Sequence, residues 1–67
     1  MNLRQRLGKN VQRIRKDKSW SQEEFAHRCG LHRTYISQVE RGVRNPTITV
    51  LEKLAKALKV EPAHLLS

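Results

Sequence analysis

The chain has 67 residues and a formal net charge of +8, from 14 Lys and Arg residues against 6 Asp and Glu residues. A chain of this length forms one domain at most, which buries only about 60% of the surface that the unfolded chain exposes. The charge favours nucleic acid or another polyanion as a partner, and the single Cys excludes an internal disulfide. No apolar stretch approaches the roughly 20 residues of a membrane span or follows the basic N-terminus as in a signal peptide, so we expect a soluble cytoplasmic protein.

Residues 3–16 are predicted to form the first helix, because apolar side chains recur there at helical spacing. These are Leu3, Leu7, Val11 and Ile14. Gly8 weakens the helix by up to about 1 kcal/mol relative to Ala. Many Lys and Arg residues crowd the same segment and indicate a solvated face. A helix lying on a membrane surface is the alternative, but the segment lacks the exposed aromatic face that such helices use.

The second helix is predicted over residues 22–29 from signals at both of its ends. Ser21 is a good N-cap, and Glu24 three residues later completes a capping box, in which each residue satisfies a backbone N–H of the other. Gly30 ends the helix, because a left-handed residue after the last turn costs Gly little. Cys29 in the last turn is expected to be a buried structural thiol.

The third helix is predicted over residues 33–41, closed by Gly42, and its two faces differ in polarity. At about 100° per residue, apolar residues lie on one side and polar residues fill an arc of roughly 140° on the other. This polar arc consists of Arg33, Thr34, Ser37, Gln38 and Arg41. Arg suits the edge of guanine, Gln the edge of adenine, and Thr offers a methyl group to thymine. A plain solvated helix face is the alternative interpretation.

Residues 43–47 are expected to form a loop, because Asn45 precedes Pro46 and is therefore biased towards an extended conformation. Arg44 and Asn45 are candidates for contact with a phosphate backbone. Thr47 is a candidate for the same contact, or for the N-cap of the following helix.

A fourth helix is predicted over residues 48–58 from its strong apolar stripe. Pro62 suits the first position of a final short helix over residues 62–66. That helix carries Leu65 and Leu66, which add more apolar surface than a bundle this small needs to bury. The elements together predict an all-α, compact bundle of five helices.

Residues 22–41 also carry a spaced pattern of small and apolar residues, with Ala26 fifth, Gly30 ninth, and Phe25, Cys29, Leu31, Ile36 and Val39 at the apolar positions. The fifth residue must be small because a bulky one would collide with the following helix. This pattern resembles the helix-turn-helix of phage-repressor-like regulators of the lambda repressor/Cro or Xre type. Their SQEELA, ISxIERG and NPTxxxLxKLAxAL signatures appear here as SQEEFA, ISQVERG and NPTITVLEKLAKAL, and the likeness covers about residues 3–66. The segment HRTYISQVERGVRNPT also looks like the controller proteins of restriction-modification systems.

The resemblance implies one lambda repressor-like DNA-binding domain over residues 1–67, whose helix 33–41 enters the major groove while helix 22–29 crosses the backbone. The implied function is sequence-specific binding of double-stranded DNA by a transcriptional regulator. The base-reading candidates are Arg33, Thr34, Ser37 and Gln38. The candidates for contact with the DNA backbone, or for an accessory contact, are Gln22, Tyr35, Arg41, Arg44, Asn45 and Thr47.

Arg15 and Glu40 are expected to form a structural salt bridge. In the family that the sequence resembles, an Arg at the position of Arg15 pairs with the Glu of the ERG signature, which is Glu40 here. Glu40 lies at the edge of the apolar side of its helix, and a partly buried carboxylate needs a partner such as a bidentate Arg. This favours a structural role for the pair over a catalytic one.

The histidines do not predict a metal site. His27, His32 and His64 lack the spacing of metal ligands, and no phosphate-binding loop, carboxylate pair or nucleophile triad is present. We expect no enzyme activity, metal, cofactor or small-molecule ligand. His32 stands at the N-cap of the third helix, where the family more often has Ser, Thr or Asp, so it is either a weaker cap or a contact to a phosphate.

One small domain reads few base pairs, so specificity requires two copies on a pseudo-palindromic operator, about 34 Å apart if they are separated by one turn of DNA. We expect a homodimer joined through the fourth and fifth helices, with Leu65 and Leu66 in the interface. An antitoxin-type module that binds a toxin and retains DNA binding is the rival interpretation. RNA binding also fits the charge, but the chain lacks aromatic residues free for base stacking.

Overall fold

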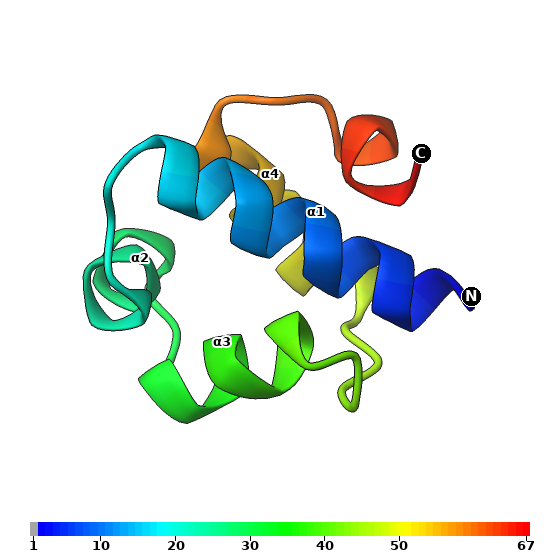
Figure 1. The fold of residues 1–67 in the computed structure, drawn as a ribbon, viewed down its shortest axis with the longest axis horizontal. Helices are drawn as coiled ribbons and strands as arrows, with labels where there is room; N and C mark the ends of the chain where they lie inside the picture. Colours follow the sequence, from blue (N-terminus) through cyan, green and yellow to red (C-terminus); the bar gives the residue numbers. More distant parts are fainter. Residues whose placement is uncertain (1) are drawn as a thin grey trace.

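The computed structural model describes residues 2–67 as four α-helices followed by one 3-10 helix (Figure 1). The elements in chain order are α1 (Leu3–Asp17), α2 (Gln22–Cys29), α3 (Arg33–Glu40), α4 (Ile48–Leu58) and η1 (Pro62–Leu66). No strand occurs in this part of the chain. Residue 1, which the domain prediction included, lies outside the described residues.

The prediction of a bundle of five α-helices is wrong, because the last element, η1, is a 3-10 helix. Five residues that begin with Pro provide few backbone donors, and the N–H of His64 instead donates to the oxygen of Glu61, three residues back, at 2.9 Å. The Asn10 amide nitrogen on α1 then donates to the backbone oxygens of Leu65 at 2.9 Å and of Ser67 at 3.0 Å. These bonds hold η1 against α1.

Side-chain caps fix the beginnings of α1 and α2. Asn2 Oδ1 accepts the N–H of Gln5 at 2.9 Å, and Gln5 Oε1 accepts the N–H of Asn2 at 3.3 Å, which is a capping box that the sequence analysis did not predict. Ser21 Oγ accepts the N–H of Glu24 at 3.0 Å, as expected. The Glu24 carboxylate, however, lies 2.9 Å from the guanidinium of Arg28, so only one half of the predicted box forms at α2.

The turns after α2 and before α4 follow the sequence signals. Gly30 ends α2 with a left-handed φ of 71°. Thr47 caps α4, because its hydroxyl oxygen accepts the N–H of Val50 at 3.2 Å. The helices α2 and α4 therefore begin and end at the predicted residues.

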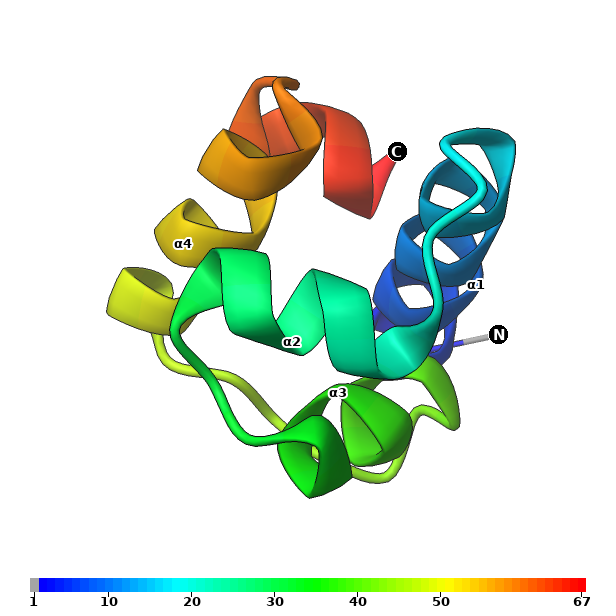
Figure 2. The ribbon, with the colours of Figure 1, turned by 90° about the vertical axis from the view of Figure 1, so that its left-hand side faces the viewer.

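All five helices contribute to one buried core, which consists of Leu7, Val11, Phe25, Ala26, Cys29, Ile36, Val39, Leu54, Ala55, Leu58 and Leu65. In the view of Figure 2, α2 lies in front, with α1 to its right, α4 to its left and α3 below it. Trp20 packs at the edge of the core, its ring centre 6.1 Å from that of Phe25. Burial raises the pKa of the Cys29 thiol from 9.0 to about 11, so the thiol stays protonated and unreactive at neutral pH.

Gly8 lies where α1 passes closest to the end of α3. A Cβ atom on this residue would stand 2.4 Å from the backbone oxygen of Val39 and 2.7 Å from that of Glu40. The backbone of α1 can approach these two carbonyls only because Gly8 has no side chain. The glycine that weakens the helix pattern in the sequence is thus a packing requirement between two helices.

Candidate nucleic-acid interface

The polar arc of α3 points away from the core. Ile36 and Val39 on the opposite side of the helix are fully buried and hold it in place. Arg33, Thr34 and Arg41 are exposed, and Ser37 and Gln38 are half-buried. The predicted base-reading residues therefore share one outward face of a helix that is fixed by packing. The helix ends at Glu40, one residue before the predicted end, and Arg41 forms its C-cap.

The loop after α3 places a cation against the Tyr35 side chain of that helix. The guanidinium carbon of Arg44 lies 4.6 Å from the centre of the Tyr35 ring, which is a cation–π contact. Tyr35 is half-buried, whereas Arg44 and Asn45 are exposed. Both Tyr35 and Arg44 were predicted to contact DNA, but their contact with each other depends on the path of the loop and was not predicted. Thr47 lies at the end of the same loop and caps α4.

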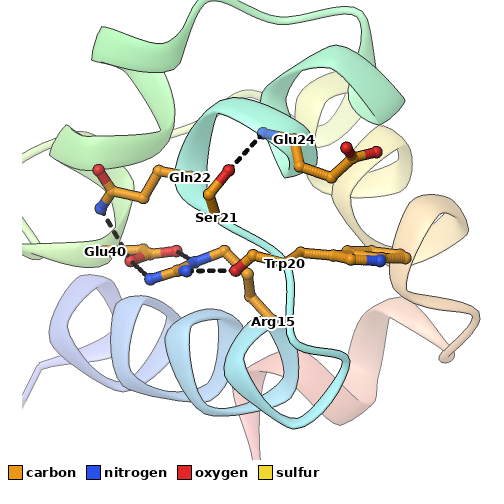
Figure 3. Close-up of polar contacts among 6 residues, drawn as sticks. All are labelled: Arg15, Trp20, Ser21, Gln22, Glu24 and Glu40. Atoms are coloured by element: carbon orange, nitrogen blue, oxygen red, sulfur yellow. Dashed lines mark hydrogen bonds and ion pairs between the residues drawn. The ribbon is translucent and has the colours of Figure 1, made fainter.

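A buried ion pair joins α1 to α3 beneath the interface (Figure 3). Arg15 Nε donates to Glu40 Oε2 at 2.6 Å, and Arg15 Nη2 donates to Glu40 Oε1 at 3.0 Å. Arg15 Nη1 donates to the backbone oxygen of Trp20 at 2.7 Å. Only 8% of the Arg15 side chain and 1% of the Glu40 side chain are exposed. The pair is bidentate, so the buried carboxylate has strong donors on both of its oxygens.

Gln22 completes this network from α2. Its amide nitrogen donates to Glu40 Oε1 at 3.0 Å, so that α1, α2 and α3 meet at one carboxylate. Gln22 was predicted to contact a DNA phosphate, and its hydrogen bond to Glu40 was not predicted. The sequence did contain a signal for this contact, because a buried carboxylate can accept more hydrogen bonds than one Arg donates to it.

His32 forms a side-chain cap at the start of α3. Its Nδ1 atom accepts the backbone N–H of Thr34 at 3.0 Å. The ring is exposed, and the backbone of His32 has the extended conformation usual for an N-cap, with φ −76° and ψ 144°. His32 therefore caps the helix even though the family more often has Ser, Thr or Asp at this position.

The two residues predicted for a dimer interface lie in different environments. Leu65 is fully buried in the core of the chain itself, so its side chain is closed to a second copy. Leu66 is half-buried and lines an apolar groove of about 170 Å³ beside Leu3 and Leu51. Near this groove Ile48, at the start of α4, leaves 79% of its surface exposed. Leu66 therefore remains a candidate for the interface, and Leu65 does not.

A model of the helix-turn-helix family matches residues 11–65 of the chain. The chain belongs to the helix-turn-helix family. The match includes α2, α3 with its polar arc, and the whole of α4. Within residues 2–67, none of the helices is both long and apolar enough to cross a membrane.

Similar helix-turn-helix proteins include controllers of restriction-modification systems. Control protein C.BamHI of Bacillus amyloliquefaciens is 52% identical over 66 residues, which are 97% of this chain and 82% of the relative. The crystal structure of the controller protein C.AhdI of Aeromonas hydrophila superposes with a TM-score of 0.89 at 40% identity, covering 92% of this chain and 94% of that one. The controller protein C.Esp1396I, solved as a tetramer in complex with its natural 35 base-pair operator, gives a TM-score of 0.86 at 37% identity, covering 97% of this chain and 86% of that one.

Proposed function

We propose that this protein is a transcriptional regulator of the restriction-modification controller type, which binds double-stranded operator DNA through one helix-turn-helix domain. The observation that carries the proposal is the outward polar arc of α3, held rigid by Ile36 and Val39 in the core and by Glu40 in the ion-pair network. Rigid placement on a helix is what base reading in a major groove requires. The net charge of +8 supports binding to DNA phosphates. A regulator of this kind acts where the genome lies, in the cytoplasm at the nucleoid.

The side chains divide by what they contact on DNA. We assign base reading to Arg33, Thr34, Ser37 and Gln38, which lie on the outward face of α3. The contact of Arg44 with the Tyr35 ring holds the two side chains together beside that face. We assign Tyr35 to a thymine methyl or the sugar-phosphate backbone, and Arg44 to a phosphate. Backbone contacts are assigned to Gln22, Arg41, Asn45 and, through its exposed surface, Thr47.

Arg33→Ala is expected to relax the preference for one base pair in each half-site. A bidentate contact between Arg and guanine discriminates by about 1–3 kcal/mol, and Arg33 stands in the first turn of α3, which projects deepest into the groove. The measurement is the affinity for a selected operator and for its single-base variants, at two salt concentrations.

Arg13→Ala serves as the matched control, because Arg13 is an exposed Arg on α1, whereas the polar arc belongs to α3. It removes the same charge and should leave the order of preferred bases unchanged. An even loss of affinity across all operator variants in Arg33→Ala would instead show that Arg33 contacts the backbone.

We also propose that the protein binds its operator as a homodimer, through the exposed apolar residues at Leu66 and the start of α4. Ile48→Ser should raise the dimer dissociation constant about tenfold or more, because a symmetric interface loses the buried side chain twice. Sedimentation velocity over a range of concentrations measures this constant without DNA. Thr49→Ser, at the exposed neighbouring position, is the control. A wild-type protein that stays monomeric at all concentrations and binds each operator as a single copy would refute the dimer.

A further inference from the structure

His32 carries a hydrogen-bonding atom that the cap of α3 does not use. Its Nδ1 atom is the acceptor in the 3.0 Å bond from the Thr34 N–H. An imidazole nitrogen that accepts a hydrogen bond carries no proton, so the neutral ring holds its proton on Nε2. Among residues 2–67, Nε2 forms no hydrogen bond, and the ring is exposed. The cap therefore fixes the tautomer and leaves an N–H donor on the far side of the ring.

The position of this donor is what gives it a function. His32 directly precedes Arg33 and Thr34, the first two residues of the polar arc, and both are exposed beside it. Because Nδ1 faces the first turn of α3, Nε2 faces outward from the same end of the helix. The N-terminal end of a recognition helix lies nearest to base edges and flanking phosphates. The ring thus presents a donor where the DNA presents acceptors.

The chemistry of a His cap differs here from that of the usual N-cap residues. An Asp would cap the helix equally well but would place a negative charge beside phosphates. A Ser or Asn side chain is too short to cap the helix and also to reach outward. A neutral His with its proton on Nε2 caps through one nitrogen and donates through the other.

We propose that His32 is a further DNA-contacting residue, whose Nε2–H donates to an acceptor on the operator while its Nδ1 caps α3. The proposal rests on the proposed function of the protein. The acceptor is an oxygen or nitrogen at the edge of the DNA, supplied either by a phosphate or by guanine N7.

The test compares His32→Asn with the wild type. Asn is among the best N-cap residues, so the thermal stability of the variant should equal or exceed that of the wild type. Its affinity for the selected operator should nevertheless fall about three- to tenfold, as expected for one lost hydrogen bond. His64→Asn, at an exposed His on η1, is the matched control and should bind as the wild type does.

Modified operators then identify the acceptor. Replacing single guanines by 7-deazaguanine, or single phosphates by methylphosphonates, should weaken the wild type wherever a contacted acceptor is removed, and at one such position per half-site the His32→Asn variant should lose no further affinity. Sensitivity to the deazaguanine assigns the contact to a base, and sensitivity to the methylphosphonate assigns it to the backbone; either result supports the proposal.

Three results would contradict the proposal, and each can be told apart from the others. Equal affinity of a stable His32→Asn variant and the wild type would overturn the contact while leaving the proposed function intact. A weakened variant whose loss is the same on every modified operator would show that His32 acts only through the cap. A wild type that selects no DNA sequence from a random library would overturn the proposed function, and this proposal with it.

Discussion

Glu40→Ala is expected to lower the free energy of unfolding by about 3–5 kcal/mol, the range found when one partner of a buried ion pair is removed. The change leaves the guanidinium of Arg15 in a site where only 8% of its side chain is exposed. It also removes the acceptor for the Gln22 amide, which lies 3.0 Å from Glu40 Oε1. Two donors on different helices lose the same carboxylate, so the cost exceeds that of a single hydrogen bond.

A loss of this size is a large part of the total stability of so small a domain. At about 0.05–0.15 kcal/mol per residue, the 67-residue chain is stable by only several kcal/mol. Much of the Glu40→Ala protein should therefore be unfolded at 37 °C. Urea titration followed by circular dichroism at a lower temperature measures the difference while the variant still folds.

The chain offers a matched control in the Glu24–Arg28 pair. Its N–O distance of 2.9 Å is similar, but its side chains are 48% and 47% exposed. Glu24→Ala should cost at most about 1 kcal/mol, because solvent screens an exposed pair. Arg15→Ala should resemble Glu40→Ala, and the double variant should cost less than the sum of the two. Additive losses would show that Arg15 and Glu40 do not interact.

The sequence predicted the helix boundaries well where local signals fix them. The helix α2 is set by the Ser21 cap and by Gly30, and α4 begins at the Thr47 cap. Each signal acts within a few residues, so no knowledge of the fold is required. The polar arc of α3 was predicted for the same reason, because the helical period alone separates the faces of a helix that has one buried side.

The contacts that the sequence did not predict join residues far apart in the chain. Leu65 packs into the core in a short helix that is held by a hydrogen bond from Asn10, 55 positions earlier, to the Leu65 backbone oxygen. The apolar side chain of Leu65 predicts an apolar environment but does not distinguish the core from a dimer interface. Likewise, Gln22 suits a phosphate by its place at a helix N-terminus, and only the packing of α2 against α3 brings its amide to Glu40.

Gly8 shows the same limit and supports the second large effect that we expect. In the sequence Gly8 counts only as a poor helix former, for which Ala is better by about 1 kcal/mol. In the fold an added Cβ would lie 2.4 Å from the Val39 oxygen and 2.7 Å from the Glu40 oxygen. Both obstacles are backbone atoms of a helix fixed in the core, so rotation of a side chain cannot relieve the overlap.

Gly8→Ala is therefore expected to destabilise the protein by about 2 kcal/mol, since an overpacking cost of about 3 kcal/mol exceeds the gain of about 1 kcal/mol in helix propensity. To relieve the overlap, α1 must move away from α3, and this movement also lengthens the bonds between Arg15 and Glu40. The Gly8→Ala and Glu40→Ala changes should consequently be less than additive when they are combined. Lys9→Ala, at the exposed neighbouring position of α1, is the control and should change stability by no more than about 0.5 kcal/mol. If Gly8→Ala instead raises the urea midpoint, helix propensity outweighs packing at this site, and the close approach of α1 to α3 is not required for the fold.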